Sequence, residues 1–300
     1  MRPFLGNIDW SAPPKDVVAA VAAPASRLET PCGNGSMIWH RWDGPKDRPD
    51  DRAPVVLLHG GWGSWTHWIK TIPALASART VFAADLPGMG SSADAPPPQS
   101  AETLSDIVAD GIDAILPDGA PYHAVCFSFG GVIGTWAAAR HGQRCRSLTL
   151  VGASGFGELH FVVTGIQVPD PALPDVEIDA IHRQNLSRLM FADAAEIDPL
   201  ALHIHRHNIA RGRVRTRRIS LSSALIEALP RVSSPISGIW GEADATGGGR
   251  ADIEKRRNVL RRYQPACRFD IIPGAGHWIM YEQADVFTDA LFRHLQEYGD

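Results

Sequence analysis

Short apolar runs alternate with helix-like stretches along most of this 300-residue chain, and this alternation constrains the fold more than any other feature. The runs are rich in valine, isoleucine and leucine, as expected for strands that are buried on both faces of a sheet. Between two of them, residues 102–116 repeat apolar side chains at helical spacing. Alternating strands and helices form βαβ units, so we predict an α/β fold with a mostly parallel, doubly wound sheet. The predicted strands cover residues 54–58, 80–84, 122–126, 148–151, 236–240 and 269–272.

The alternation stops near Gly155 and resumes only after Ser233. The intervening segment has a proline-rich start and polar helical patterns but no run typical of a buried strand. Because a structureless loop of this length is improbable, the sequence predicts an inserted helical cap. We therefore divide the chain into an N-terminal part of the core (1–155), a cap (156–233) and a C-terminal part of the core (234–300).

The composition is that of a soluble globular protein, with 44% apolar and 21% charged residues. A net charge of −4 argues against a nucleic-acid partner, which usually binds a basic domain. No stretch approaches the roughly 18 apolar residues that a membrane span requires. The alanine-rich run at 17–25 is too short for a signal peptide, and Asp16 directly precedes it. The four cysteines form no CxxC pair, so we expect reduced thiols and a cytoplasmic location.

A serine stands where a predicted strand meets a predicted helix, in the stretch VCFSFGG at residues 125–131. This arrangement is typical of a nucleophile elbow, a strained turn that exposes the hydroxyl of Ser128 at the edge of the sheet. The residues two positions before and two positions after the serine must be small. Gly130 meets this requirement, whereas Cys126 replaces the usual glycine. Cysteine is small enough that we expect it to be tolerated.

An acid and a histidine follow the serine in chain order, each directly after a predicted strand. Asp244 follows the strand at 236–240, and His277 follows the strand at 269–272. A serine hydroxyl becomes a good nucleophile only when a base removes its proton, and the base needs a carboxylate to orient it. We therefore expect Ser128 to be the nucleophile, His277 the general base and Asp244 the orienting acid. Glu242 is the rival acid.

The stretch HGGWG at 59–63 follows the first buried strand, where an oxyanion hole is expected. We expect the backbone N–H of Gly61 or Trp62 to be one donor and that of Phe129 to be the second. His59 is expected to support this loop rather than act as a second base. Trp62 and Trp278 flank the expected oxyanion and base positions, which predicts a bulky, apolar substrate pocket to which Trp278 and Phe127 are assigned.

With these motifs in place, the chain resembles the capped α/β-hydrolase superfamily over residues 30–297. The stretches that carry the resemblance are the loop at 59–62, the loop at 85–92, the elbow at Ser128, and Gly276-His277-Trp278 together with Asp244. Relatives such as haloalkane dehalogenases and epoxide hydrolases have an aspartate at the elbow, so the serine distinguishes this chain from them. Esterases, lipases, lactonases, peptidases of the proline iminopeptidase type and C–C bond hydrolases remain. The segment 276–282 is similar to the last group, and the His59-Gly60-Gly61 loop is closer to esterases.

Two features of the cap region leave alternatives open. His203, His205 and His207 invite a metal site, but in a helix only His203 and His207 share a face, and no acidic third ligand lies nearby in sequence. We therefore predict no metal. Arginines are frequent from Arg206 to Arg218, where a solvated surface is the default interpretation and a clamp for an anionic substrate is the functional one.

These observations predict a carboxylic-ester hydrolase that forms an acyl-enzyme on Ser128 and acts on a small apolar or aromatic substrate. No cofactor is required. One alternative is a C–C bond hydrolase acting on a ring-cleavage diketone acid. The other is a non-catalytic ligand-binding protein on the same scaffold. The cysteine at 126 is the only sequence feature that favours it. Oligomeric state cannot be predicted from these features.

Overall fold

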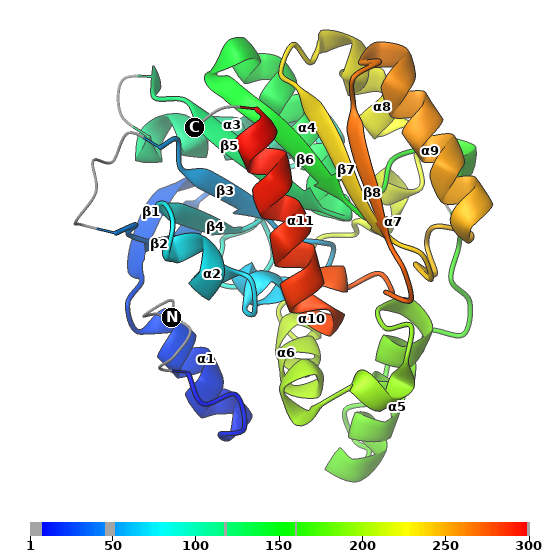
Figure 1. Ribbon diagram of the computed structural model, residues 1–300. Coiled ribbons are helices and arrows are strands. Elements are labelled where there is room, and N and C mark those ends of the chain that lie inside the picture. The colour runs from blue at the N-terminus through cyan, green and yellow to red at the C-terminus, as the bar shows by residue number, and fades with distance from the viewer. Residues whose placement is uncertain (1–7, 46–51, 117–118, 160, 299–300) are drawn as a thin grey trace.

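An eight-stranded sheet forms the centre of the computed structural model, which describes residues 8–45, 52–116, 119–159 and 161–298 (Figure 1). The strand order is β1-β2-β4-β3-β5-β6-β7-β8. From β4 to β8 all neighbours are parallel, whereas β2 is antiparallel to both β1 and β4. The mostly parallel α/β sheet predicted from the sequence is thereby confirmed. The strands are β1 (Ser26–Cys32), β2 (Gly35–Trp42), β3 (Val55–Leu58), β4 (Val81–Asp85), β5 (Tyr122–Phe127), β6 (Cys145–Val151), β7 (Ile236–Gly241) and β8 (Arg268–Ile272).

Helices cover both faces of the sheet, and each face has its own buried apolar cluster (Figure 1). The helical pattern at residues 102–116 is observed as α3, which begins after a capping box at Ser100 and buries Leu104, Val108 and Ile112 at helical spacing. One face carries α3 (Ala101–Ile115), α4 (Phe129–His141), α8 (Ala224–Ala228) and α9 (Arg250–Tyr263). The other carries α2 (Ile72–Ala76), α10 (Ile279–Glu282) and α11 (Ala284–Glu297). Short 3₁₀ turns are η2 (Trp65–Trp68), η4 (Gly142–Arg144), η5 (Gly157–Leu159), η6 (Ala194–Glu196) and η7 (Leu229–Arg231).

The N-terminal region adds a helix, α1 (Pro14–Ala22), which the sequence analysis did not predict. It overlaps the alanine-rich run at 17–25 and has a proline in its first turn, where the missing N–H costs nothing. Val17 and Val21 are one helical turn apart and buried. The helix packs against α6 (Pro199–Ile209), so the run is part of the folded protein.

The segment between β6 and β7 is helical, as predicted, and contains α5 (Asp175–Leu189), α6, α7 (Arg217–Ser220) and α8. Its first helices lie beyond the edge of the sheet (Figure 1). There the carbonyl of Met190, at the end of α5, accepts a hydrogen bond of 2.8 Å from the N–H of Trp278. By contrast, α8 packs against α4. The division of the chain at residues 156 and 233 stays a prediction. The outer ends of the two predicted core parts, residues 1–7 and 299–300, lie outside the described residues.

Asn208 ties α6 to the loop that follows β3. Its side-chain carbonyl accepts a hydrogen bond of 2.8 Å from the hydroxyl of Ser64, and its amide donates to the hydroxyl of Thr66 at 3.2 Å. Asn208 is 1% exposed, so these bonds are shielded from water. A displacement of α6 would therefore pull on the loop that contains the predicted oxyanion hole.

Within the described residues, no helix is both long and apolar enough to cross a membrane.

Candidate active site

Ser128 lies at the turn between β5 and α4 and has backbone angles of φ 51° and ψ −115°. A residue other than glycine seldom adopts this region, and such strain costs about 1–3 kcal/mol. The turn is held because the N–H of Ser128 donates to the carbonyl of Val151 at 2.9 Å, and the N–H of Ser154 donates to the carbonyl of Ser128 at 3.1 Å. A Cβ at Gly130 would lie 2.5 Å from the carbonyl oxygen of His59, which explains the small residue there.

Cys126, the departure from the usual elbow pattern, is accommodated by a glycine in α4, the helix that begins directly after Ser128. A Cβ added to Gly134 of α4 would lie only 2.3 Å from the Sγ of Cys126. The missing side chain at Gly134 therefore provides the room that the sulfur fills. Burial raises the pKa of the Cys126 thiol well above its usual range, so this cysteine is an inert packing residue.

We predict that Gly134→Ala lowers the free energy of unfolding by about 1–3 kcal/mol, because overpacking at the sulfur outweighs the better helix propensity of alanine. In a Cys126→Gly background the same substitution should be neutral or stabilising, since the clash is gone. Urea unfolding of the four proteins in this double-mutant cycle measures the coupling. Equal losses in both backgrounds would contradict the packing explanation.

Three side chains from separate loops form a continuous hydrogen-bonded chain at the carboxyl edge of the sheet. The Oγ of Ser128 lies 3.0 Å from the Nε2 of His277. The Nδ1 of His277 lies 2.9 Å from the Oδ2 of Asp244. Asp244 and His277 follow β7 and β8 and are 2% and 4% exposed. The structure thus brings together the three residues that the sequence predicts as a triad.

Asp244 is held as a carboxylate by its neighbours. Burial alone would raise its pKa, but the charge and hydrogen bond of His277 and the hydrogen bond from Thr246 outweigh this and keep the pKa below its usual value. Thr246 donates to Oδ1 of Asp244 from both its N–H and its hydroxyl, each at 2.8 Å. The rival Glu242 pairs with Arg250 at 2.7 Å instead.

His59 is fully buried and supports the predicted oxyanion loop. The Nε2 of His59 accepts a hydrogen bond of 2.9 Å from the N–H of Leu86, and its Nδ1 lies 2.7 Å from the carbonyl of Gly60. This confirms the interpretation of His59 as a structural residue. Trp62 has a positive φ of 50°. None of the described residues accepts a hydrogen bond from the N–H of Trp62 or of Phe129.

A cavity of about 190 Å³ opens beside Ser128 and His277. Phe127 lines it and also stacks near His277, with ring centroids 4.8 Å apart. The remaining lining residues are Gly60, Gly61, Trp62, His67, Ser154, Phe161, Val162, Val163, Ile166, Leu189, Met190, Thr216, Arg217, Ser220, Leu221 and Thr246. The surroundings of the serine are therefore mostly apolar, with a few polar side chains among them.

Trp278 does not line this cavity, which corrects the prediction made from the sequence. It is 1% exposed, and its indole N–H donates to the backbone carbonyl of His67 at 2.8 Å. Its ring packs against Tyr281 and Phe191, with centroids 4.3 Å and 5.9 Å away. Because its polar atom is satisfied inside the protein, Trp278 is a core residue that supports the loop of His67.

The sequence analysis missed several polar residues of the site. Thr246 follows the acid by two residues, a spacing typical of a turn closed on an aspartate, so this signal was available. Arg217, which belongs to the arginine-rich stretch considered as an anion clamp, also borders the cavity. His67 and Ser154 reach it from two other segments, and they carry no local pattern, because only the packing of distant segments brings them to Ser128.

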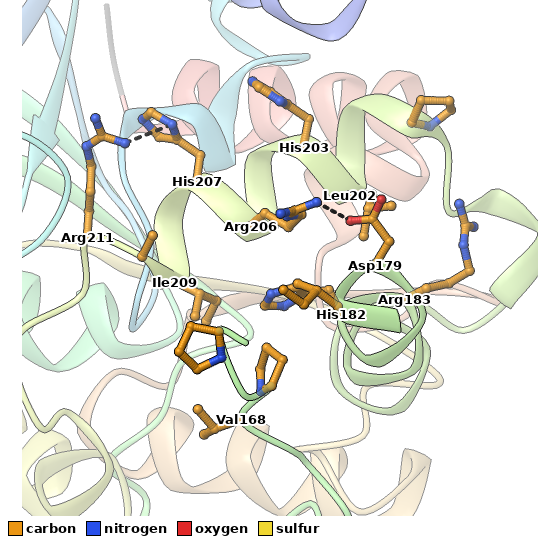
Figure 2. A pocket seen from close by; sticks show the side chains of 15 residues that line it. Val168, Asp179, His182, Arg183, Leu202, His203, Arg206, His207, Ile209 and Arg211 are labelled. Carbon is orange, nitrogen blue, oxygen red and sulfur yellow. Dashed lines mark hydrogen bonds and ion pairs between the residues drawn. The ribbon is translucent and has the colours of Figure 1, made fainter. Parts of the chain in front are cut away.

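A second, more open hollow lies between α5, α6 and the loop at 168–171 (Figure 2). Figure 2 shows that Arg206 extends toward Asp179, with which it pairs at 2.5 Å. His203 and His207 share a face, as predicted, with ring centroids 6.2 Å apart, whereas His205 lies against His182. No group of three potential metal ligands occurs within the described residues.

A family model described as "Alpha/beta hydrolase family" matches residues 55–290, which is most of the chain. The chain therefore belongs to this family. The resemblance inferred from the motifs is confirmed by the family match and by the sheet.

Among curated relatives, the chain is 39% identical over 106 residues to a dihydrolipoyllysine-residue acetyltransferase component of an acetoin cleaving system from Pseudomonas putida, which covers 35% of this chain and 28% of that protein. It is 37% identical over 111 residues to a pimeloyl-[acyl-carrier protein] methyl ester esterase of Neisseria meningitidis, covering 36% and 40% of the two chains. It is 35% identical over 109 residues to a 2-hydroxymuconate semialdehyde hydrolase of a Pseudomonas species, covering 34% and 37%. The chain thus spans well under two thirds of these relatives.

A solved structure of a putative lipase from Acinetobacter baumannii has the same fold. It superimposes with a TM-score of 0.75 at 17% identity and covers 97% of this chain and 98% of its own. At this identity the likeness concerns the fold alone.

Proposed function

We propose that the protein is a serine hydrolase that cleaves carboxylic esters through an acyl-enzyme on Ser128. The observation that carries the proposal is the chain of hydrogen bonds from the Ser128 hydroxyl through His277 to Asp244, at 3.0 and 2.9 Å. These distances fit a nucleophile in contact with its base and a base in contact with its orienting acid. The esterase among the relatives supports the same reaction class.

In the proposed reaction, Asp244 accepts the Nδ1–H of His277, which leaves Nε2 free to take the proton of Ser128. The serine oxygen attacks the ester carbonyl, and the resulting oxyanion is bound by the N–H groups of Phe129 and of Gly61 or Trp62. His277 then gives its proton to the leaving alcohol. A water that is deprotonated by His277 releases the acid and restores the serine. None of these steps requires a cofactor.

Two measurements test the proposal together. We expect initial rates on p-nitrophenyl esters to peak at short acyl chains, because a cavity of about 190 Å³ holds only a small acyl group. We also expect a fluorophosphonate probe to label Ser128, located by peptide mass spectrometry. A folded protein that neither cleaves any ester nor takes the label would instead be a ligand-binding protein.

Cleavage of a C–C bond is the second candidate, and Arg217 is the observation that favours it. This exposed arginine borders the cavity of Ser128, and a guanidinium at that position can pair with the carboxylate of a diketone acid. One relative is a 2-hydroxymuconate semialdehyde hydrolase. The distinguishing assay follows the loss of the yellow colour of a ring-cleavage diketone acid. Faster turnover of this substrate than of any simple ester would make C–C hydrolysis the principal activity.

A further inference from the structure

His67 is a polar side chain in the wall of the cavity that the proposed mechanism does not use. It comes from η2, directly after the loop at 59–63, and it is 6% exposed. Its Nδ1 is buried, and neither ring nitrogen is hydrogen-bonded to any other described residue. Buried polar atoms in proteins almost always have a partner, so an imidazole without one at the wall of a cavity is available to a group that enters the cavity, through whichever nitrogen the packing leaves open.

Packing determines which edge of the imidazole is available. A Cβ built on Gly63 would lie 2.3 Å from Cε1 and 2.5 Å from Nδ1 of His67, so this edge is pressed against the backbone. Phe127 and Trp278 meet the ring nearly edge-on, with centroids 5.5 and 5.2 Å away. The edge left to border the cavity is therefore the one that carries Nε2.

The ring is also electrically neutral in this position. Burial, and then the neighbouring His59, His205 and His277, hold the pKa of His67 well below its usual range. A neutral imidazole has one N–H donor and one acceptor nitrogen. It is therefore suited to a hydroxyl or carbonyl group rather than to a carboxylate.

Ser154 provides a second polar group in the wall of the same cavity from a different loop. It follows β6, is 2% exposed, and its hydroxyl has no partner among the described residues. The described residues include other buried polar atoms without partners, but within that set only His67 and Ser154 line this cavity.

We infer that His67 and Ser154 form a polar subsite that binds a neutral hydroxyl or carbonyl group in the acyl part of the substrate. The inference rests on the proposed ester hydrolysis and narrows its substrate class to oxygenated short-chain esters. Plain alkanoyl esters leave both groups without a partner, and a site built to hydrogen-bond a substrate oxygen discriminates against analogues that lack it.

The test compares matched pairs of esters. The pairs are p-nitrophenyl 3-hydroxybutanoate with butanoate, and p-nitrophenyl levulinate with pentanoate. For the wild type we expect kcat/KM to be about tenfold higher for the oxygenated member of at least one pair, the gain of one hydrogen bond between neutral groups. His67→Phe should bring this ratio close to one. His67→Gln should keep most of it, because the glutamine amide reaches the position of Nε2, and His67→Asn should not.

A second variant and a binding measurement protect the test against ambiguous outcomes. Ser154→Ala removes a hydroxyl that has no partner in the fold and should reduce the same ratio, even where His67→Phe does not fold. Titration calorimetry with Ser128→Ala and the corresponding uncleaved methyl esters should show about tenfold tighter binding of the oxygenated ester. This arm remains informative if the protein proves not to be an esterase. A ratio near one in the wild type, or a ratio unchanged by both His67→Phe and Ser154→Ala, overturns the inference.

Discussion

Ser128→Ala is expected to lower kcat for the best p-nitrophenyl ester by about 10⁴- to 10⁶-fold, because the other members of the triad cannot act without the nucleophile. The hydroxyl has a single hydrogen-bond partner among the described residues, the Nε2 of His277. Alanine also keeps the backbone strain of the elbow unchanged. The loss should therefore come from chemistry rather than from unfolding.

The measurement is steady-state kinetics, with the thermal midpoint of unfolding recorded for both proteins. We expect midpoints within a few degrees of each other, and complete loss of fluorophosphonate labelling in the variant. Retention of more than about one hundredth of the wild-type rate in a folded Ser128→Ala protein would show that another residue carries the reaction.

Asp244→Asn is expected to reduce kcat by about 10⁴-fold while the fold persists. Asparagine can still accept from Thr246 through its carbonyl oxygen. Its amide then faces the Nδ1 of His277, and because two N–H groups cannot bond to each other, the imidazole places its proton on Nε2. In that tautomer His277 has no lone pair with which to take the proton of Ser128.

The same carboxylate-to-amide change at Glu242 is the matched control. Glu242 lies two residues away but pairs with Arg250 on the surface, so Glu242→Gln should leave kcat within about twofold of the wild type. Comparison of kcat for the two variants decides which carboxylate orients the histidine. A large loss in Glu242→Gln together with a small loss in Asp244→Asn would reverse the assignment.

Much of the fold follows from local sequence pattern, because a strand buried on both faces must be continuously apolar. The predicted strand at 122–126 is observed as β5, with every residue buried. By contrast, β1 has a mixed burial pattern and exposes several of its side chains. Its place in the sheet comes from pairing with β2 rather than from an apolar run, so periodicity could not reveal it.

Part of the candidate site could likewise be predicted from local sequence pattern, and part of it could not. Ser128, Asp244 and His277 each follow a recognisable strand, and the parallel sheet brings such positions to one edge. Trp278 was expected in the wall of the cavity but lies in the core, whereas His67, to which no role was assigned, lines the cavity, because which aromatic ring reaches it depends on how the rings stack. That packing joins segments more than two hundred residues apart, as in the bond from Trp278 to the carbonyl of His67. No spacing rule in the sequence contains this information.

The contact between Cys126 and Gly134 also bears on how this elbow can change during evolution. A chain with glycine at 126 is free to carry alanine at 134, and a chain with glycine at 134 is free to carry cysteine at 126. Cysteine and alanine together collide, since the added Cβ would lie 2.3 Å from the sulfur. A lineage can therefore reach Cys126 only after position 134 has become glycine, and it must lose the cysteine before a larger residue returns. The two substitutions therefore occur in one order and are reversed in the opposite order.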